Sequence, residues 1–383
     1  MTKTNLGLTI SLFALGSAAG LSQPVQAADL DKVIHDCRKG VDLKVSGQIN
    51  QALLYADDGH ESDIFIVDND NSSTRFRFVG KGQINCDWQV GTTLEFEWES
   101  NSTGDIKIGQ KDSVDGKLKE RKVELWFKGP LGKLSLGQGD AASNGIAEVD
   151  LSKTGVAAHS SVASMAGGIL FFGTGLEIKD VSPNLDGSGR LNRVRYDTPT
   201  FAGFTLSTSY SDNNLWDVAL KYAQALGDFR VAGAIGYANP DPQGGDGLDF
   251  ADIYAGSLSI RHAPTGLNVT VAAGNANNYN GGETGFRAAA SVKHDAQVYY
   301  AKLGWLADLS NIGHTAFSVD YQKTNDFDVK GDKFHSYGAA IVQNFEGVGV
   351  EIYGAARWHE VDLTGVPDPD GIFAAMVGSR IKF

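Results

Sequence analysis

The sequence predicts an all-β fold: a closed barrel of sixteen antiparallel strands that spans a membrane. Three observations support this prediction. Short runs of alternating apolar and polar residues recur along the chain, and Gly is abundant (47 of 383 residues) while Pro is scarce (9). The gaps between these runs are alternately long and short. Alternating runs joined by turns indicate strands, and long loops at one rim with tight turns at the other are typical of outer-membrane barrels.

The amino-terminal residues predict export. Lys3 precedes an apolar stretch from Leu6 to Leu21, and a small-residue cleavage site ends at Ala27. These are the parts of a secretory signal peptide, which we expect over residues 1–27. A short periplasmic segment is then expected over 28–40 and the barrel over 41–383.

No later stretch reaches the ~18 to 20 consecutive apolar residues that a membrane helix needs. A closed barrel is the other structure that satisfies every backbone group in lipid. The predicted strands, in order, are Val41 to Ala56, Ser73 to Ile84, Trp88 to Ser100, Leu118 to Gly129, Gly132 to Gln138, Arg190 to Asp197, Gly203 to Ser211, Leu215 to Ala223, Asp228 to Ala238, Ala251 to His262, Gly266 to Gly274, Gln297 to Ala307, Ile312 to Lys323, Phe334 to Asn344, Val348 to His359 and Gly371 to Phe383.

The connections predict which rim each strand end occupies. Odd-numbered gaps tend to be long, and the longest of them runs from residue 139 to 189. Even-numbered gaps are tight turns such as Pro130-Leu131, and only Asp212 to Asn214 is short where a long loop is expected. A loop as long as 139–189 is expected to have a function or to be disordered.

Strand alternation separates two faces. In residues 91–100, Leu94, Phe96 and Trp98 alternate with Glu95, Glu97 and Glu99, so apolar groups and carboxylates point to opposite sides. The polar face of the whole set holds Lys44, Arg75, Arg77, Glu95, Glu97, Arg193, Arg195, Lys302 and Arg357. A water-filled lumen tolerates such a face, whereas a packed core does not.

A secreted β-sandwich is the alternative, because its strands also alternate. The apolar face of the last strand, which runs to Phe383 at the carboxyl terminus, argues against it. We expect Phe383 to serve membrane assembly.

Several sequence blocks resemble the trimeric general porins of Gram-negative outer membranes, in particular the proteobacterial branch. They are KVSGQINQALLYADDG (44–59), STRFRFVGKG (73–82), LSLGQGD (134–140), EVDLSKTG (148–155), RVRYDTPTFAGFTLSTSYSD (193–212) and GSRIKF (378–383). Each block is short, but together they cover nearly all of the mature chain in order.

The resemblance implies a homotrimer and a third loop, residues 139–189, that folds inward to constrict the pore. It further implies that acids of this loop face arginines of the barrel wall. The loop acids would be Asp140, Glu148 and Asp150, and the wall bases would be Arg75, Arg77, Arg193 and Arg195. Strand alternation alone places these four arginines on the lumen face. Alternatively, the arginines form ordinary salt bridges with Asp197, Glu95 or Glu97, and Glu148 and Asp150 lie on a solvated loop surface.

Cys37 precedes the first strand and Cys86 lies in the first tight turn, so both are expected at the periplasmic rim. A disulfide between Cys37 and Cys86 would clip the amino-terminal segment to the barrel in an oxidising compartment. Two free thiols are the alternative.

Other chemistry finds little support. External loops carry Asp68, Asp70, Asp241, Asp246 and Asp249, which could hold Ca²⁺, but the twelve-residue calcium-loop pattern is absent, so we expect no metal and no cofactor. The sequence His159-Ser160-Ser161 does not by itself make a catalytic triad, and an enzyme is not expected. The net charge of −13 argues against binding nucleic acid.

These observations predict an outer-membrane porin for passive diffusion of small hydrophilic solutes and ions. Its expected partners are two further copies of itself, outer-membrane lipid and lipopolysaccharide. The alternatives are a porin selective for oligosaccharides or an anion, with Trp126 and Tyr300 as stacking steps in the lumen, or a non-conducting barrel that acts as an adhesin or an enzyme. Acids in the loops predict a weak preference for cations, opposed by a wall that attracts anions.

Overall fold

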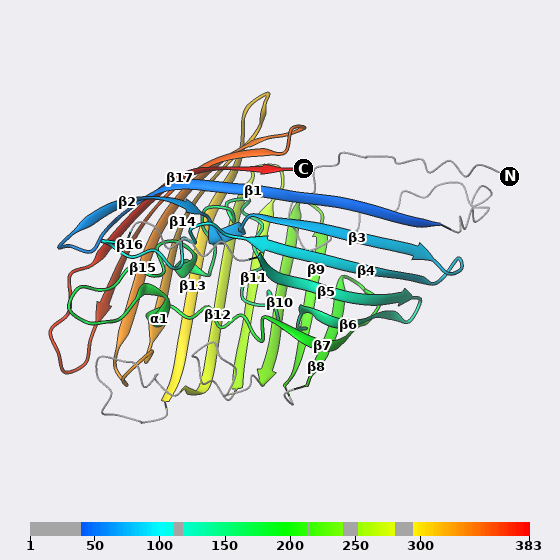
Figure 1. Cartoon of the computed structure of the whole chain (residues 1–383), viewed down its shortest axis with the longest axis horizontal. Helices are drawn as coiled ribbons and strands as arrows, with labels where there is room; N and C mark the ends of the chain where they lie inside the picture. The colour runs from blue at the N-terminus through cyan, green and yellow to red at the C-terminus, as the bar shows by residue number, and fades with distance from the viewer. Residues whose placement is uncertain (1–39, 111–117, 213–214, 240–251, 280–293) are drawn as a thin grey trace.

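The computed structural model describes residues 40–383 except 111–117, 213–214, 240–251 and 280–293. One antiparallel sheet closes on itself into a barrel (Figure 1). The strands are β1 (Val41–Asp57), β2 (Ser62–Asp68), β3 (Arg75–Gln83), β4 (Gln89–Trp98), β5 (Leu118–Gly129), β6 (Gly132–Asp140), β7 (Arg190–Asp197), β8 (Phe204–Ser211), β9 (Trp216–Leu226), β10 (Phe229–Asn239), β11 (Asp252–His262), β12 (Leu267–Tyr279), β13 (His294–Ser310), β14 (Gly313–Asn325), β15 (Lys333–Phe345), β16 (Val350–Asp362) and β17 (Ile372–Lys382).

The short strands β2 and β3 together form one of the sixteen strands of the barrel. β3 pairs with the first part of β1, from Val41 to Gln48, and β2 pairs with the second part, from Gln51 to Asp57. A one-turn 3₁₀ helix η1 (Asp70–Ser72) lies between them. Pairing of β1 with β17 closes the sheet. The predicted sixteen-stranded antiparallel barrel is therefore confirmed.

The predicted strands leave residues 57–72 as a long connection between the first strand and the second, and this prediction is wrong, because β2 lies within them. β2 is apolar on both faces: Ile64 and Ile66 are exposed on the outside, while Phe65 and Val67 are buried on the inside. It therefore lacks the alternation of apolar and polar residues that indicates the other strands in the sequence. Its inner face can be apolar because a loop inside the barrel covers it.

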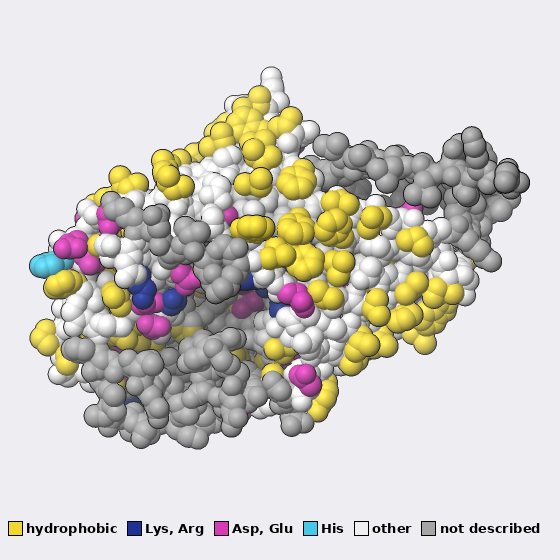
Figure 2. All heavy atoms as spheres, in the orientation of Figure 1, with side chains coloured by type: hydrophobic (Ala, Val, Ile, Leu, Met, Phe, Trp, Pro, Cys, Tyr) yellow, Lys and Arg dark blue, Asp and Glu magenta, His cyan; other side chains and the backbone are white. Residues whose placement is uncertain are grey.

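The outer face of the barrel is a band of exposed apolar side chains. Leu136 on β6, Val194 on β7, Ile235 on β10 and Val377 on β17 are each about half exposed. Figure 2 shows such side chains, in yellow, spread across the visible face. A band of this extent is costly in water and is expected against lipid. Among the residues that the structure describes, no helix is long and apolar enough to cross a membrane.

The carboxyl terminus completes the closure of the barrel. The backbone N–H of Gly47 donates to the carbonyl of Phe383 at 2.8 Å, and that of Phe383 donates to Gly47 at 3.0 Å. The Phe383 ring lies over Gly47, where an added Cβ would come within 2.6 Å of the ring and within 2.9 Å of the backbone carbonyl oxygen of Arg75. Glycine is therefore required where the ends of the sheet meet, whereas the role of Phe383 in membrane assembly stays a prediction.

The long connection between β6 and β7, residues 141–189 and here called loop 3, lies inside the barrel. It contains a 3₁₀ turn η2 (Val162–Ser164) and a single helical turn α1 (Ile178–Val181). Its apolar residues Val162, Met165 and Phe171 pack in one buried cluster with inward-facing residues such as Leu54 and Met376. A second cluster joins the start and end of the loop, through Ile146 and Leu185, to the inner faces of β9 to β13. Loop 3 thus covers one side of the interior with apolar contacts.

Candidate functional site

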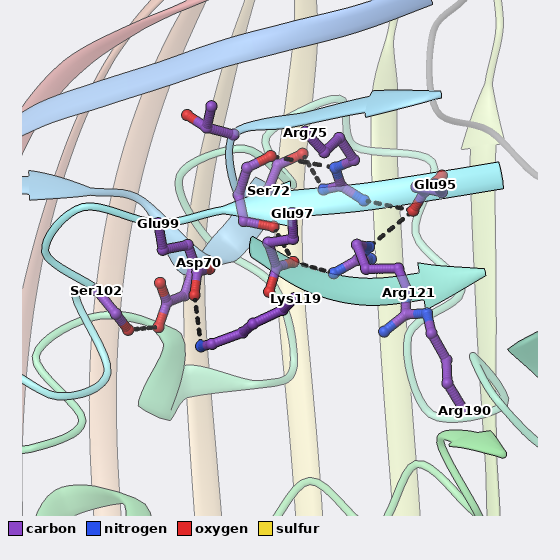
Figure 3. Close-up of polar contacts among 12 residues, drawn as sticks. Asp70, Ser72, Arg75, Glu95, Glu97, Glu99, Ser102, Lys119, Arg121 and Arg190 are labelled. Carbon is purple, nitrogen blue, oxygen red and sulfur yellow. Dashed lines mark hydrogen bonds and ion pairs between the residues drawn. The ribbon is translucent and has the colours of Figure 1, made fainter. Parts of the chain in front are cut away.

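The inner faces of β3, β4 and β5 carry a network of guanidinium groups and carboxylates. The register places Arg75 opposite Glu97 and Arg77 opposite Glu95. Arg77 forms an ion pair with Glu95, and Arg75 Nη1 lies 3.8 Å from Glu95 Oε1. Arg121 Nε lies 2.7 Å from Glu95 Oε1, and its Nη1 forms a short contact with Glu97. Figure 3 shows Arg121 bridging the two glutamates.

The two kinds of charge in this network are unequally exposed. The Arg77 side chain is 42% exposed, whereas that of Glu95 is only 1% exposed. Arg75 is also partly open, at 20%. Glu95 thus lies behind Arg75 and Arg77, and at these positions the lumen meets positive charge. Figure 2 shows blue and magenta side chains gathered around a hollow near the middle of the face.

Sequence reasoning missed Arg121, because simple alternation turns it towards lipid. A register shift between β4 and β5 pairs Glu95 with Lys122 but Phe96 with Glu120, which leaves Arg121 as an extra residue in β5. Such a bulge turns one more side chain to the same face. The signal for it is the run Lys119-Glu120-Arg121-Lys122, since four consecutive charges cannot alternate with lipid-facing residues.

Beside this network, Asp140 connects β5, β6 and β7. It was expected among the acids of the loop, and the structure has it as the last residue of β6. It forms an ion pair with Lys122, and Arg190 Nε lies 3.0 Å from its Oδ1. Arg190 is one-third exposed. We call Arg75, Arg77, Arg121, Lys122 and Arg190 together the arginine wall.

Arg193 and Arg195 hold the beginning of loop 3. Arg193 pairs with Glu124 at 2.5 Å, donates to the carbonyls of Gly137 and Asp140, both at 2.9 Å, and is only 3% exposed. Arg195 pairs with Asp197 at 2.7 Å and donates to the Ala141 carbonyl at 2.8 Å. Both arginines face inward as alternation predicts, but their guanidinium groups bind the root of the loop.

The two acids expected further along loop 3 do not contact the arginine wall. Glu148 accepts a hydrogen bond from Asn184 Nδ2 at 2.7 Å and is partly exposed. Asp150 lies 2.7 Å from Lys302 Nζ on β13, across the barrel from β3. Burial opposes ionisation of Asp150, but Lys302 holds its pKa below the ordinary value. These contacts correct the expected position of Asp150 opposite the arginines.

The remaining lumen residues divide by their exposure. Lys44, near the beginning of β1, is exposed. Lys302 is fully buried and also donates to the carbonyl of Ala158 in loop 3 at 2.6 Å. Arg357 on β16 is buried and pairs with Asp320 on β14 at 2.6 Å. Lys302 and Arg357 thus face inward beneath loop 3, away from the open part of the lumen.

Two acidic residues, Asp70 of η1 and Glu99, lie beside the arginine wall (Figure 3). Asp70 accepts from the Ser102 hydroxyl at 2.5 Å and from the Gly104 N–H at 2.9 Å. Burial, and then the nearby Glu99, raise the pKa of Asp70 well above its ordinary value. Glu99 itself pairs with Lys119 at 3.1 Å. Figure 3 shows Asp70 and Glu99 side by side.

The described residues include two of the acids considered for calcium, Asp68 and Asp70, and one of the two cysteines, Cys86. The described part of the chain contains no group of three or more His, Cys, Asp or Glu residues that could hold a metal ion. Asp241, Asp246 and Asp249 lie outside the described residues. Cys86 is disulfide-bonded, but Cys37 lies outside the described residues, so the pairing of the two stays a prediction.

Comparisons with known proteins agree with this architecture. Residues 11–363 match the model of the family described as "Gram-negative porin". Among solved structures, an anion-selective porin from Comamonas acidovorans superposes with a TM-score of 0.60 at 14% identity and covers 90% of this chain and 100% of its own.

OmpT of Vibrio cholerae, expressed in the outer membrane, gives a TM-score of 0.55 at 13% identity, covering 90% of this chain and 99% of its own. OmpF of Salmonella typhi gives 0.53 at 14%, covering 91% and 99%. No curated protein sequence matches the chain. The family match extends over almost the whole sequence, and the chain belongs to the Gram-negative porin family.

Proposed function

We propose that the passage between the arginine wall and loop 3 is the constriction of this porin and that it weakly favours small hydrophilic anions. Family and fold support an outer-membrane pore for passive diffusion, and they point to a channel rather than an enzyme. The finer proposal rests on one observation: Arg77 and Arg75 are 42% and 20% exposed, whereas the Glu95 carboxylate beside them is 1% exposed.

The charge balance at this position supports the sign of the preference. The arginine wall contributes five positive groups, and Glu95, Glu97 and Asp140 contribute three negative ones, so the cluster carries 5 − 3 = +2. Fixed charge in a narrow wet passage concentrates ions of the opposite sign. The partly exposed Glu148 on loop 3 reduces this effect, so we expect a weak preference.

Sugar stacking is less well supported as a second function. Both aromatic residues that were expected to act as stacking steps are buried, Tyr300 beneath loop 3 and Trp126 on the inner face of β5 with Lys133 Nζ 5.6 Å from its ring centre. A hydrolytic role for His159-Ser160-Ser161 has no support either, because Ser160 donates to the Ala147 carbonyl and His159 Nδ1 accepts from the Ser161 backbone.

Three further features belong to the proposal. Assembly as a homotrimer is supported by family membership and by the solved trimer form of OmpT from Vibrio cholerae. The exposed apolar band suits outer-membrane lipid and lipopolysaccharide. Export by a signal peptide over residues 1–27 is a proposal from the sequence alone, since those residues lie outside the described part.

The test is recording from purified protein in a planar bilayer under a salt gradient. We expect insertion in groups of three equal conductance steps and a reversal potential whose sign corresponds to anions. A reversal potential of the opposite sign would contradict the proposed selectivity. Absence of conductance from intact trimers would contradict the pore itself.

A further inference from the structure

A row of polar side chains is buried between loop 3 and the barrel wall, away from the arginine wall. Tyr300 on β13, Gln322 on β14, Ser336 on β15 and His359 on β16 are direct cross-strand neighbours. Tyr300 is 4% exposed and the other three are 0% exposed. We call these four residues the buried polar row.

Most of the polar atoms in this row have no hydrogen-bond partner in the described part of the protein. They include the Tyr300 hydroxyl, both amide atoms of Gln322 and both ring nitrogens of His359. The hydroxyl of Thr324 and one carboxylate oxygen of Asp320, adjacent to Gln322 along the same face of β14, are also without one. Buried polar atoms are nearly always hydrogen-bonded, and a contiguous group of exceptions calls for a ligand.

The surroundings determine the kind of ligand. On one side of the row, Lys302 pairs with Asp150 and Arg357 pairs with Asp320, so two positive charges are balanced by two negative ones. On the other side, the ring of Phe334 stacks on His359 with a centroid separation of 5.7 Å. The site is therefore enclosed and has no net charge to attract an ion.

We propose that a cluster of ordered water molecules occupies this site and bridges the wall to loop 3. Hydroxyl, amide and imidazole groups together offer both donors and acceptors, and they require a small neutral ligand that is both as well. Water meets this requirement, and a buried water typically forms about three hydrogen bonds to such groups. The cluster goes beyond the function of the pore and does not depend on its ion selectivity.

The proposed water cluster explains how the apolar part of loop 3 packs against the polar side chains of the buried polar row. Beside the row, loop 3 makes direct polar contacts through Lys302, which reaches Asp150, Thr154 and Ala158. Elsewhere on this side the loop contributes apolar residues to the buried cluster. Water satisfies the wall groups that the loop does not reach.

The test is a crystal structure of the full-length porin at a resolution that places individual waters. We expect separate density peaks within hydrogen-bonding distance of Gln322 and His359. Absence of density would overturn the proposal, and so would continuous density of a larger molecule, which would indicate a small neutral solute instead.

A pair of variants controls for chance hydration. In Gln322→Leu, the peaks that contact the amide should disappear. Gln343→Leu is the matched control, because the amide of Gln343 on β15 already binds protein atoms, including the Asn344 carbonyl at 2.8 Å. It should leave the peaks unchanged. Peaks that persist in Gln322→Leu would show that the row does not hold them.

Discussion

Two regions of the inner wall contain the same kinds of residue in different surroundings. The arginine wall on β3, β5 and β7 faces open lumen, and Arg77 there is 42% exposed. On the wall formed by β13 to β17, here called the covered wall, Lys302 is 0% exposed although it too points inward. The difference is loop 3, which packs on one region and faces the other. Strand alternation thus determines which face a residue occupies, whereas the loop determines whether that face meets water.

The largest expected effect on stability and conductance comes from breaking the ion pair that holds loop 3 against the covered wall. In Lys302→Met, Asp150, which is only 12% exposed, would lose its charged partner, and breaking a buried ion pair in this way typically costs about 3 to 5 kcal/mol. We expect a lower unfolding temperature of the trimer and a larger, noisier conductance as the loop loosens. Thermal unfolding monitored by circular dichroism, with bilayer recording, checks both.

The double variant Lys302→Met/Asp150→Asn is the control for this prediction. Removing both charges avoids the unpaired carboxylate, so it should recover part of the lost stability. If Lys302→Met unfolds at the temperature of the unmodified protein, the ion pair does not hold the loop.

A charge change on the arginine wall should alter ion selectivity. Arg77→Glu lowers the charge of the cluster from +2 to 0, so the anion preference should disappear and the reversal potential should approach zero. Lys44→Glu makes the same change at an exposed position near the beginning of β1 and should have a smaller effect. Equal shifts in the two variants would mean that the arginine wall is not the selective position.

The smallest expected effect is a pH dependence that originates in His159 of loop 3. Burial lowers the pKa of His159 below its ordinary value of 6.5. As pH falls below about 6.5, the unfolded chain therefore binds the proton first, and the free energy of unfolding decreases. The stability difference between the unmodified protein and His159→Gln should shrink from pH 7.5 to pH 5.

Measuring this difference isolates His159 from other titrating groups. Asp186, for example, has a pKa raised by burial and by Glu148, so its contribution to the free energy of unfolding falls as pH rises. Because Asp186 is present in both proteins, this contribution cancels in the difference between them. If the stability difference between the two proteins stays constant with pH, folding does not lower the pKa of His159.

Much of the fold could be predicted from sequence because the strands record their environment. The alternation of Glu95 and Glu97 with Phe96 and Trp98 separates two faces, and the structure confirms them: Trp98 is exposed on the outside, and both glutamates join the inner ion-pair network. β2 was missed because loop 3 makes its inner side apolar as well. Arg121 was missed because a bulge breaks the alternation.

The site was harder to predict than the fold, since it depends on contacts between distant segments. Alternation identifies Arg193 and Arg195 as inward-facing, but it does not reveal that they bind the root of loop 3. The partner of Asp150 lies 152 residues away on β13. Such pairings follow from the path of loop 3, which no local pattern encodes.

The accessibility of the two walls to a water-soluble thiol reagent tests the central comparison most directly. Arg77→Cys places a thiol on the arginine wall and Ser336→Cys places one on the covered wall, while Cys86 is disulfide-bonded. We predict rapid modification and reduced conductance at position 77 and slow modification at position 336. Equal rates at the two positions would contradict the conclusion that loop 3 separates an open wall from a covered one.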